Sequence, residues 1–241
     1  MDKENEQYHA RYLTCERKGV FLLLMISAGM MGAYTYNLRG GVFCNAQTAN
    51  VVLMSMAFGK GQIKEGLYYL IPISAYISGA FVSEFLPNPL KKIGLLRWDT
   101  YLVGFEIFTL LIIGFIPLSA PNRLVQVIIN FICSMQYNTF RQAEGIPMAT
   151  TFCTNHIRQI GISLARAAKH KDVHVLKRGA AHFSMVCAFL AGGLILTAFC
   201  ALFQEKAIWL AIIPLLINFF TLAHADIFQE HNMLSQKPSG H

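Results

Sequence analysis

Two stretches of this chain place a threonine where a short helix is expected to begin beside long apolar runs. The first is residues 39–50, RGGVFCNAQTAN, and the second is residues 145–156, GIPMATTFCTNH. An approach marked by glycine or proline precedes each threonine, so Thr48 and Thr154 are the predicted N-caps. Helix N-termini carry unpaired N–H groups and a partial positive charge, which attract anions and carboxylates. We therefore predict that these two helix ends face a common polar cavity.

Polar side chains next to these threonines extend the candidate binding site. Asn50 lies in the first stretch, and Asn155 and His156 lie in the second. Arg158 follows Thr154 by one helical turn, so it is expected either to hold an anionic group or to extend to the cytoplasmic interface and set the topology. The alternative for the threonines and asparagines is that they only cap helices and join spans by hydrogen bonds.

Glu106 is an ionisable residue inside an otherwise apolar run. Such residues are costly at membrane depth and are commonly functional, so Glu106 is a candidate proton or cation site, or a partner of Arg158 or Arg141. The other interpretation is a position near the interface, because Asp99 lies only about two helical turns away. Gln136 lies near the end of another apolar run and is expected to form a hydrogen bond between helices. The alternative is that it lines the same cavity.

The composition indicates an integral membrane protein. Of the 241 residues, 54% are hydrophobic and 14% are charged, whereas soluble domains carry about 25% charged residues. The net charge of +7 is then a topology signal and does not predict nucleic-acid binding. The six cysteines show no metal-ligand spacing, and lysines surround His170 and His174. Because no Walker loop and no nucleophile–base set is visible, we expect no enzyme activity, no cofactor and no metal.

Long uncharged runs predict six membrane-spanning helices, because a span needs roughly 20 apolar residues. The predicted spans are residues 20–38, 68–86, 101–117, 124–140, 182–202 and 207–224. Two shorter helices, 48–58 and 154–164, begin at the threonines, and residues 166–178 are expected to form a basic loop. The sequence thus predicts an all-α membrane protein with six transmembrane helices plus two short motif helices.

The order of these elements repeats along the chain. Each half reads span, motif helix, span, span, which predicts two internal repeats. The predicted parts are a cytoplasmic N-terminal lead (1–18), the repeats (19–118 and 119–224) and a polar, frayed C-terminal tail (225–241). If the motif helices do not cross the membrane, there are six spans and the second half is inverted; if they cross with their extended approaches, there are eight and the halves are parallel. The distribution of lysine and arginine barely separates these topologies, and we prefer six spans with both termini in the cytoplasm.

From Gly19 to Leu222, the chain resembles the YoaK family of small bacterial inner-membrane proteins in four runs: RGGVFCNAQTANVVLM, YYLIPISAYISGAFVSEFL, RWDTYLVGFEIFTLLIIGFIPL and FICSMQYNTFRQAEGIPMATTFCTNHIRQIG. The resemblance implies a multi-pass protein of the inner (plasma) membrane and no established activity, because the family is a domain of unknown function. This chain departs from the family pattern at Gly32, where the family has an aspartate, and at Ala49 and Asn155, where it has glycines. If those glycines let a backbone approach a ligand, this chain approaches less closely or binds something different.

Two functions from different classes follow from these features. The first is a small secondary transporter of a small polar or anionic solute, and the second is a non-transport membrane scaffold or sensor. The expected partners are the lipid bilayer and the solute, and a homo-oligomer is among the assemblies that the sequence leaves open. For the transporter, the candidate substrate-binding residues are Thr48, Asn50, Thr154, Asn155, His156, Arg158, Glu106 and Gln136.

Overall fold

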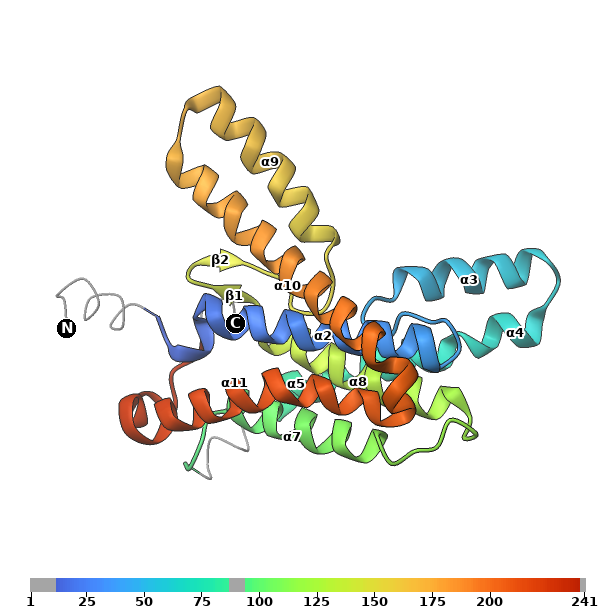
Figure 1. Ribbon diagram of the computed structural model, residues 1–241. Helices are drawn as coiled ribbons and strands as arrows, with labels where there is room; N and C mark the ends of the chain where they lie inside the picture. The colour runs from blue at the N-terminus through green and yellow to red at the C-terminus, as the bar shows by residue number, and fades with distance from the viewer. Residues whose placement is uncertain (1–11, 87–93, 239–241) are drawn as a thin grey trace.

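The computed structural model describes residues 12–86 and 94–238 as an almost entirely helical chain (Figure 1), and the prediction of an all-α fold is confirmed. The ends of the predicted lead and tail, residues 1–11 and 239–241, lie outside the described residues. The α-helices are α2 (Lys18–Leu38), α3 (Thr48–Gly59), α4 (Ile63–Tyr68), α5 (Leu70–Phe85), α7 (Trp98–Ile113), α8 (Asn122–Thr139), α9 (Thr154–His170), α10 (Val173–Phe203) and α11 (Ile212–His224). A short antiparallel hairpin precedes α9, formed by β1 (Gln142–Ala143) and β2 (Ile146–Pro147).

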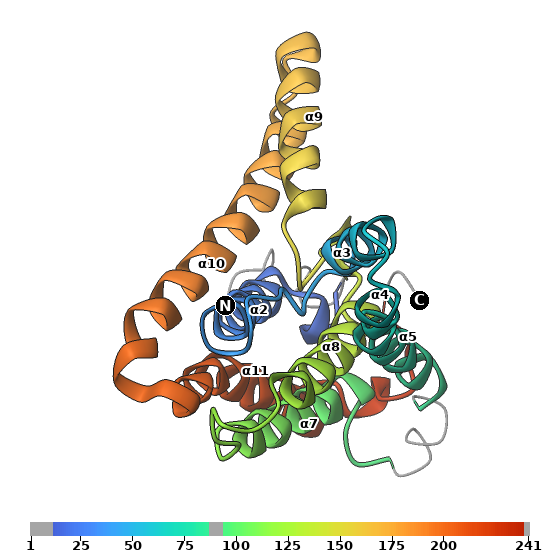
Figure 2. The same ribbon diagram turned by 90° about the vertical axis from the view of Figure 1, so that its right-hand side faces the viewer.

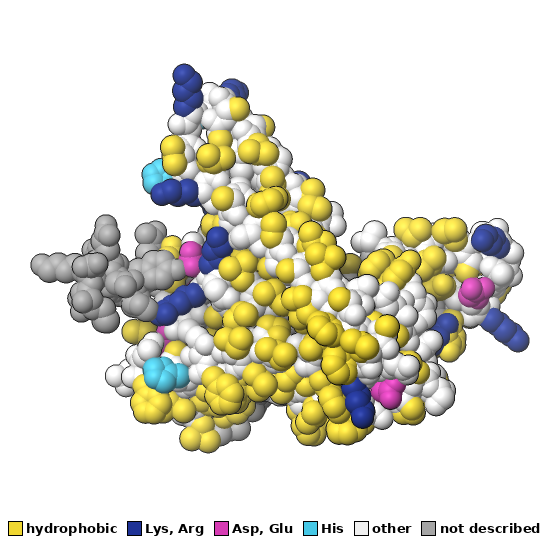
Figure 3. Space-filling model, viewed as in Figure 1, with side chains coloured by type: hydrophobic (Ala, Val, Ile, Leu, Met, Phe, Trp, Pro, Cys, Tyr) yellow, Lys and Arg dark blue, Asp and Glu magenta, His cyan; other side chains and the backbone are white. Residues whose placement is uncertain are grey.

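Within the described residues, three helical stretches are long and apolar enough to cross a membrane: Lys18–Leu38, Ile63–Phe85 and Val173–Gln229. The second of these joins α4 and α5, and the third runs from α10 through α11. Large apolar side chains, among them Phe108 and Leu202, cover much of the outer surface (Figure 3). Exposed apolar surface of this extent is typical of a face that contacts lipid. These features are compatible with a membrane protein.

The predicted spans overlap α2, α5, α7, α8, α10 and α11, but the second motif helix is longer than predicted. Helix α9 extends to His170. The predicted basic loop 166–178 is therefore wrong, because its residues end α9 and begin α10. The turn between them consists of Lys171, which has a φ of 51°, and Asp172, which caps α10 by accepting a hydrogen bond from the His174 N–H at 2.8 Å. Lysine, arginine and alanine are good helix formers, so a high charge alone did not end the helix.

Three extensive helix pairs, including the two most extensive of the described chain, join its two halves (Figures 1 and 2). Helix α2 packs against α10, α5 against α8, and α7 against α11. Two pairs of antiparallel helices, α3 with α4 and α9 with the first part of α10, project from this bundle. Glycines permit the close crossings: a Cβ at Gly192 would lie 2.0 Å from the carbonyl oxygen of Ile26, and one at Gly79 would lie 2.3 Å from that of Phe131. Small residues at such contacts allow two helix backbones to approach closely.

Buried polar groups join both ends of the described chain to the start of α7. Arg97 pairs with Asp99 at 3.2 Å, and its main-chain N–H donates to Asp226 Oδ2 at 2.9 Å. Near the N-terminus, the N–H and the hydroxyl of Thr14 both donate to Glu230 Oε1, at 2.8 and 2.7 Å. The expectation of a frayed tail was therefore wrong for its first part, which forms the helical turns η3 (Ala225–Gln229) and η4 (His231–Met233).

Candidate functional site

The two motif threonines are the first residues of their helices and not the N-caps. Gln47 caps α3 and Cys153 caps α9, and neither side chain makes a capping hydrogen bond. The first N–H groups of an α-helix have no partner within the helix. Because no cap side chain is bonded here, these donors remain for water or a ligand. The N-cap prediction for Thr48 and Thr154 was wrong by one position.

The N-termini of α3 and α9 line one pocket of about 420 Å³. Four of the predicted site residues line it: Thr48, Thr154, Asn155 and Arg158. The other lining residues are Ala46, Gln47, Tyr76 and Phe152. Amide, hydroxyl and guanidinium groups therefore surround the pocket, and no carboxylate is among these described lining residues. Such donors at paired helix N-termini suit a small polar or anionic ligand.

A chain of amides supports the α3 side of the pocket. The Gln47 Nε2 donates to Asn130 Oδ1 on α8, and the Asn50 Nδ2 donates to Gln47 Oε1 at 2.8 Å. The Asn130 amide in turn donates to the Gln126 carbonyl at 2.7 Å. Asn50 is completely buried and lies outside the pocket lining. Asn50 therefore acts on the pocket indirectly, because its hydrogen bond fixes the orientation of Gln47, which lines the pocket.

Gln136 has a similar place on the α9 side. Its Nε2 donates to the carbonyl oxygen of Thr150 at 2.9 Å, which joins α8 to the extended segment before α9. The Gln136 Oε1 and the hydroxyls of Thr150 and Thr151 are buried, and none of these three has a hydrogen-bond partner among the described residues. The expected role of Gln136 in bonding between elements therefore fits its contacts, and it does not line the pocket.

His156 and Cys153 flank the start of α9. His156 is completely buried and bonds to the Ala149 carbonyl and to His182, so it lies behind the pocket wall. Burial lowers the pKa of His156 below its ordinary value. Burial also raises the pKa of the Cys153 thiol to about 11, so this thiol stays protonated near neutral pH and is a poor nucleophile.

Glu106 does not pair with either predicted arginine. Both of its carboxylate oxygens are buried and have no partner among the described residues. Arg141 pairs instead with Glu84 at 2.8 Å, and the Arg158 Nη2 donates to Asn155 Oδ1 at 2.9 Å. The alternative in which Glu106 pairs with Arg158 or Arg141 was therefore wrong, and its side chain is completely buried in the protein. An isolated buried carboxyl group is costly in its charged form.

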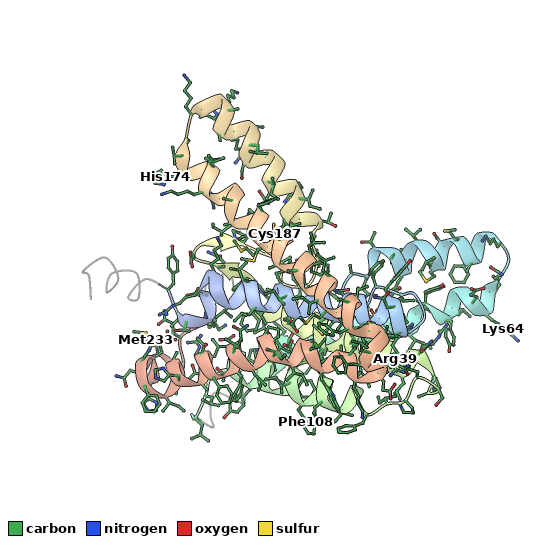
Figure 4. The ribbon with its side chains drawn as sticks, in the orientation of Figure 1. Arg39, Lys64, Phe108, His174, Cys187 and Met233 are labelled. Atoms are coloured by element: carbon green, nitrogen blue, oxygen red, sulfur yellow. The ribbon has the colours of Figure 1, made fainter. Side chains whose placement is uncertain are left out.

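Three residues that support the site were not predicted: Gln47, Tyr76 and Arg39. Arg39 is the largest fully buried side chain, and Figure 4 labels it near the end of α2. Its guanidinium donates to the Tyr34 hydroxyl and to the carbonyls of Ile116 and Pro117, which follow α7. The Arg39 carbonyl accepts from Gln126 Nε2 at 2.6 Å. Arg39 therefore fixes the start of the segment that leads to α3. The only sequence signal for this role was a single arginine directly after a long apolar run.

Comparisons with known proteins give one family. No curated protein and no solved structure matches this chain. A family model described as "Protein of unknown function (DUF1275)" matches residues 20–221, which include the bundle except the first two residues of α2 and the last three of α11, together with both helix N-termini at the pocket. The chain belongs to the DUF1275 family.

Proposed function

We propose that this protein is a YoaK-type secondary transporter that carries a small polar or anionic solute across the bacterial inner membrane. The observation that carries the proposal is the pocket of about 420 Å³ that the N-termini of α3 and α9 share. Transporters commonly place the ends of interrupted helices at the substrate site, where the N–H groups face anionic groups of the solute. Six spans, with both termini in the cytoplasm, complete the proposed topology.

The pairing of helices supports the proposal of two inverted repeats. The first helix of each half packs against the long helix that follows the motif helix of the other half: α2 against α10, and α8 against α5. The last helices of the two halves, α7 and α11, pack against each other. A pseudo-two-fold axis between the halves would produce this exchange of partners. In transporters with inverted repeats, the substrate site lies at the interface between the repeats.

Arg158 offers the first test of an anionic solute. We expect Arg158→Gln to raise the KM for uptake about tenfold or more, because a hydrogen bond to a charged group contributes roughly 1.5–3 kcal/mol. The measurement is uptake into proteoliposomes across a panel of small carboxylates, inorganic anions, nucleobases and neutral polar solutes. Arg166→Gln is the matched control, because Arg166 is also an exposed arginine of α9 but does not line the pocket. Equal effects of the two variants would exclude a direct contact of Arg158 with the solute.

The threonine pair tests whether both helix ends take part. We expect Thr48→Val and Thr154→Val each to weaken binding about threefold to tenfold, since each removes a hydroxyl worth roughly 0.5–1.5 kcal/mol in a hydrogen bond. Valine has nearly the same shape, so the melting temperature of the purified protein should change little. Loss of folding without a change in uptake by the folded fraction would contradict a binding role.

A scaffold or sensor that holds anionic lipids is the second candidate, and one feature favours it. The outer end of the hairpin formed by α9 and α10 carries exposed cationic side chains (Figure 3), namely Arg166 and Lys169 on α9, Lys171 in the turn, and Lys177 and Arg178 on α10. Clusters of this kind bind the anionic surface of the cytoplasmic leaflet. If this is the function, substitution of these five residues abolishes binding to phosphatidylserine vesicles, while the threonine variants behave as wild type in every assay except stability.

A further inference from the structure

Two buried histidines face each other behind the pocket wall. His156 lies in the first turn of α9 and His182 lies on α10, and their Nδ1 atoms are 3.0 Å apart. The exposed fraction of the residue is 0% for His156 and 3% for His182. The other ring nitrogen of His156, Nε2, is 2.8 Å from the carbonyl oxygen of Ala149. The pair therefore joins α9, α10 and the segment before α9 in one hydrogen-bonded chain.

These contacts assign the tautomer of each neutral ring. A carbonyl oxygen only accepts hydrogen bonds, so the His156 Nε2 carries a hydrogen and donates it to Ala149. The Nδ1 of neutral His156 then has a lone pair and accepts, which requires a hydrogen on the His182 Nδ1. In the neutral pair, the only nitrogen with an uncommitted lone pair is the His182 Nε2.

The same contacts limit the pair to one proton. A proton from water that adds to the His182 Nε2 gives an imidazolium whose Nδ1–H still donates to His156, so no hydrogen bond breaks. A second proton would have to bind the His156 Nδ1, where it would oppose the hydrogen of His182 across 3.0 Å. A metal ion is a poor alternative, because no group of three or more His, Cys, Asp or Glu side chains among the described residues is arranged to hold one.

Among the residues that the structure describes, no carboxylate is hydrogen-bonded to either ring. Arg178, one turn before His182 on α10, acts on that ring electrostatically. Helix α2, which packs against α10, carries no charged residue after Lys18. Three charged side chains on α9 and the segment before it are bound to other groups: Arg158 to Asn155, Arg141 to Glu84, and Glu144 to the Lys18 N–H. Burial and the lack of a counter-ion favour the neutral pair near pH 7, in agreement with the lowered pKa of His156.

We propose that the His156–His182 pair is a binding site for a single proton, and that this proton sets the charge behind the α9 end of the pocket. His156 is two residues after Thr154, which lines the pocket. A positive charge on the pair would therefore strengthen anion binding there, and a bound anion would favour proton uptake to the same extent. The proton site stands without transport, whereas its coupling to a carried anion rests on the proposed function.

The test is ¹⁵N nuclear magnetic resonance of histidine-labelled wild-type protein in lipid nanodiscs. At neutral pH we expect His156 as the Nε2–H tautomer and His182 as the less common Nδ1–H tautomer, with a direct coupling between their Nδ1 atoms. On acidification, the two rings together should bind one proton while the hydrogen bond between them is retained. Uptake of a second proton should coincide with the loss of that hydrogen bond. His174, exposed near the tip of the same hairpin and labelled in Figure 4, is the matched control for a solvated ring.

Assignment does not require the buried rings to be changed. Asparagine variants of the other six histidines, made one at a time, assign those six signals, and the two that remain belong to His156 and His182. Two Nε2–H tautomers, or two protons taken up independently, would overturn the proposal. A failed uptake assay would leave these spectra unchanged, and a failed titration would leave the uptake assay unchanged, so the two proposals fail separately.

Discussion

Replacing Gly192 with alanine is expected to destabilise the protein strongly, whereas the same replacement at Gly193 is expected to be neutral or mildly stabilising. A Cβ at Gly192 would lie 2.0 Å from the carbonyl oxygen of Ile26, and the nearest atom to a Cβ at Gly193 is 3.7 Å away. Overpacking of this kind costs about 1–3 kcal/mol, or more where backbone has to move. In an open helical position, alanine is more stable than glycine by roughly 0.5–1 kcal/mol.

The measurement is the melting temperature of the purified protein in detergent, with unfolding monitored by circular dichroism. At about 2–4 °C per kcal/mol for a chain of this size, Gly192→Ala should melt roughly 4–10 °C below wild type. Gly193→Ala is a control with the same change of residue in the same helix. Gly29→Ala should resemble Gly192→Ala, because its Cβ would lie 2.0 Å from the carbonyl oxygen of Phe189 on the opposite helix. Equal melting temperatures for the Gly192 and Gly193 variants would contradict the close crossing of α2 and α10.

Replacing Arg39 with methionine is the other change for which we expect a large loss of stability. The guanidinium satisfies three acceptors, namely the Tyr34 hydroxyl and the carbonyls of Ile116 and Pro117, at distances from 2.5 to 3.1 Å. An acceptor left buried without a partner costs about 1–3 kcal/mol. Methionine retains much of the side-chain volume and removes the donors. We therefore expect a loss of roughly 3 kcal/mol, partly offset because a buried charge is also removed.

Two further variants separate the sources of this loss. Tyr34→Phe removes one of the three acceptors of Arg39, a hydroxyl that also donates to the Glu205 carbonyl at 3.2 Å. This variant should therefore lose about a third of the stability that Arg39→Met loses. Arg39→Lys retains the charge but not the planar fork of donors, so it should restore only part of the stability. Arg166→Met is the control for losing an exposed arginine, and surface changes of this kind are usually within ±0.5 kcal/mol. If the Arg39→Met and Arg166→Met variants have the same melting temperature, the contacts of the Arg39 guanidinium do not stabilise the fold.

Arg39 also connects stability to the pocket. Because its carbonyl accepts from Gln126, and Gln126 accepts in turn from Asn130, the end of α2 and the Gln47 side of the pocket share one set of hydrogen bonds on α8. A variant at Arg39 that still folds should therefore lower affinity at the pocket as well as the melting temperature. Gly192 lies at a different helix crossing, between α2 and α10. Its alanine variant should therefore lower the melting temperature more than it lowers affinity at the pocket.

The sequence by itself determined the helical character of the protein and the approximate position of each long helix. Those properties depend on local composition, because apolar runs of roughly 20 residues form helices wherever their backbone must satisfy its own hydrogen bonds. The two threonine-led stretches also pointed to the two helix ends that line one pocket. The helix boundaries were less accurate around α9 and α10, since charged residues with high helix propensity suggest a loop by polarity alone.

Only the tertiary structure decided which polar side chains meet. Tyr76 lies in an apolar run, and His182 begins one, so neither stands out in the sequence, yet Tyr76 lines the pocket and His182 bonds to His156. Conversely, an arginine partner was one of the alternatives for Glu106, and its carboxylate has no partner among the described residues. The physical reason is that such contacts join residues far apart in the chain. Their distances depend on how helices cross, and crossings such as that of Gly29 with α10 are determined by packing between helices rather than by either helix alone.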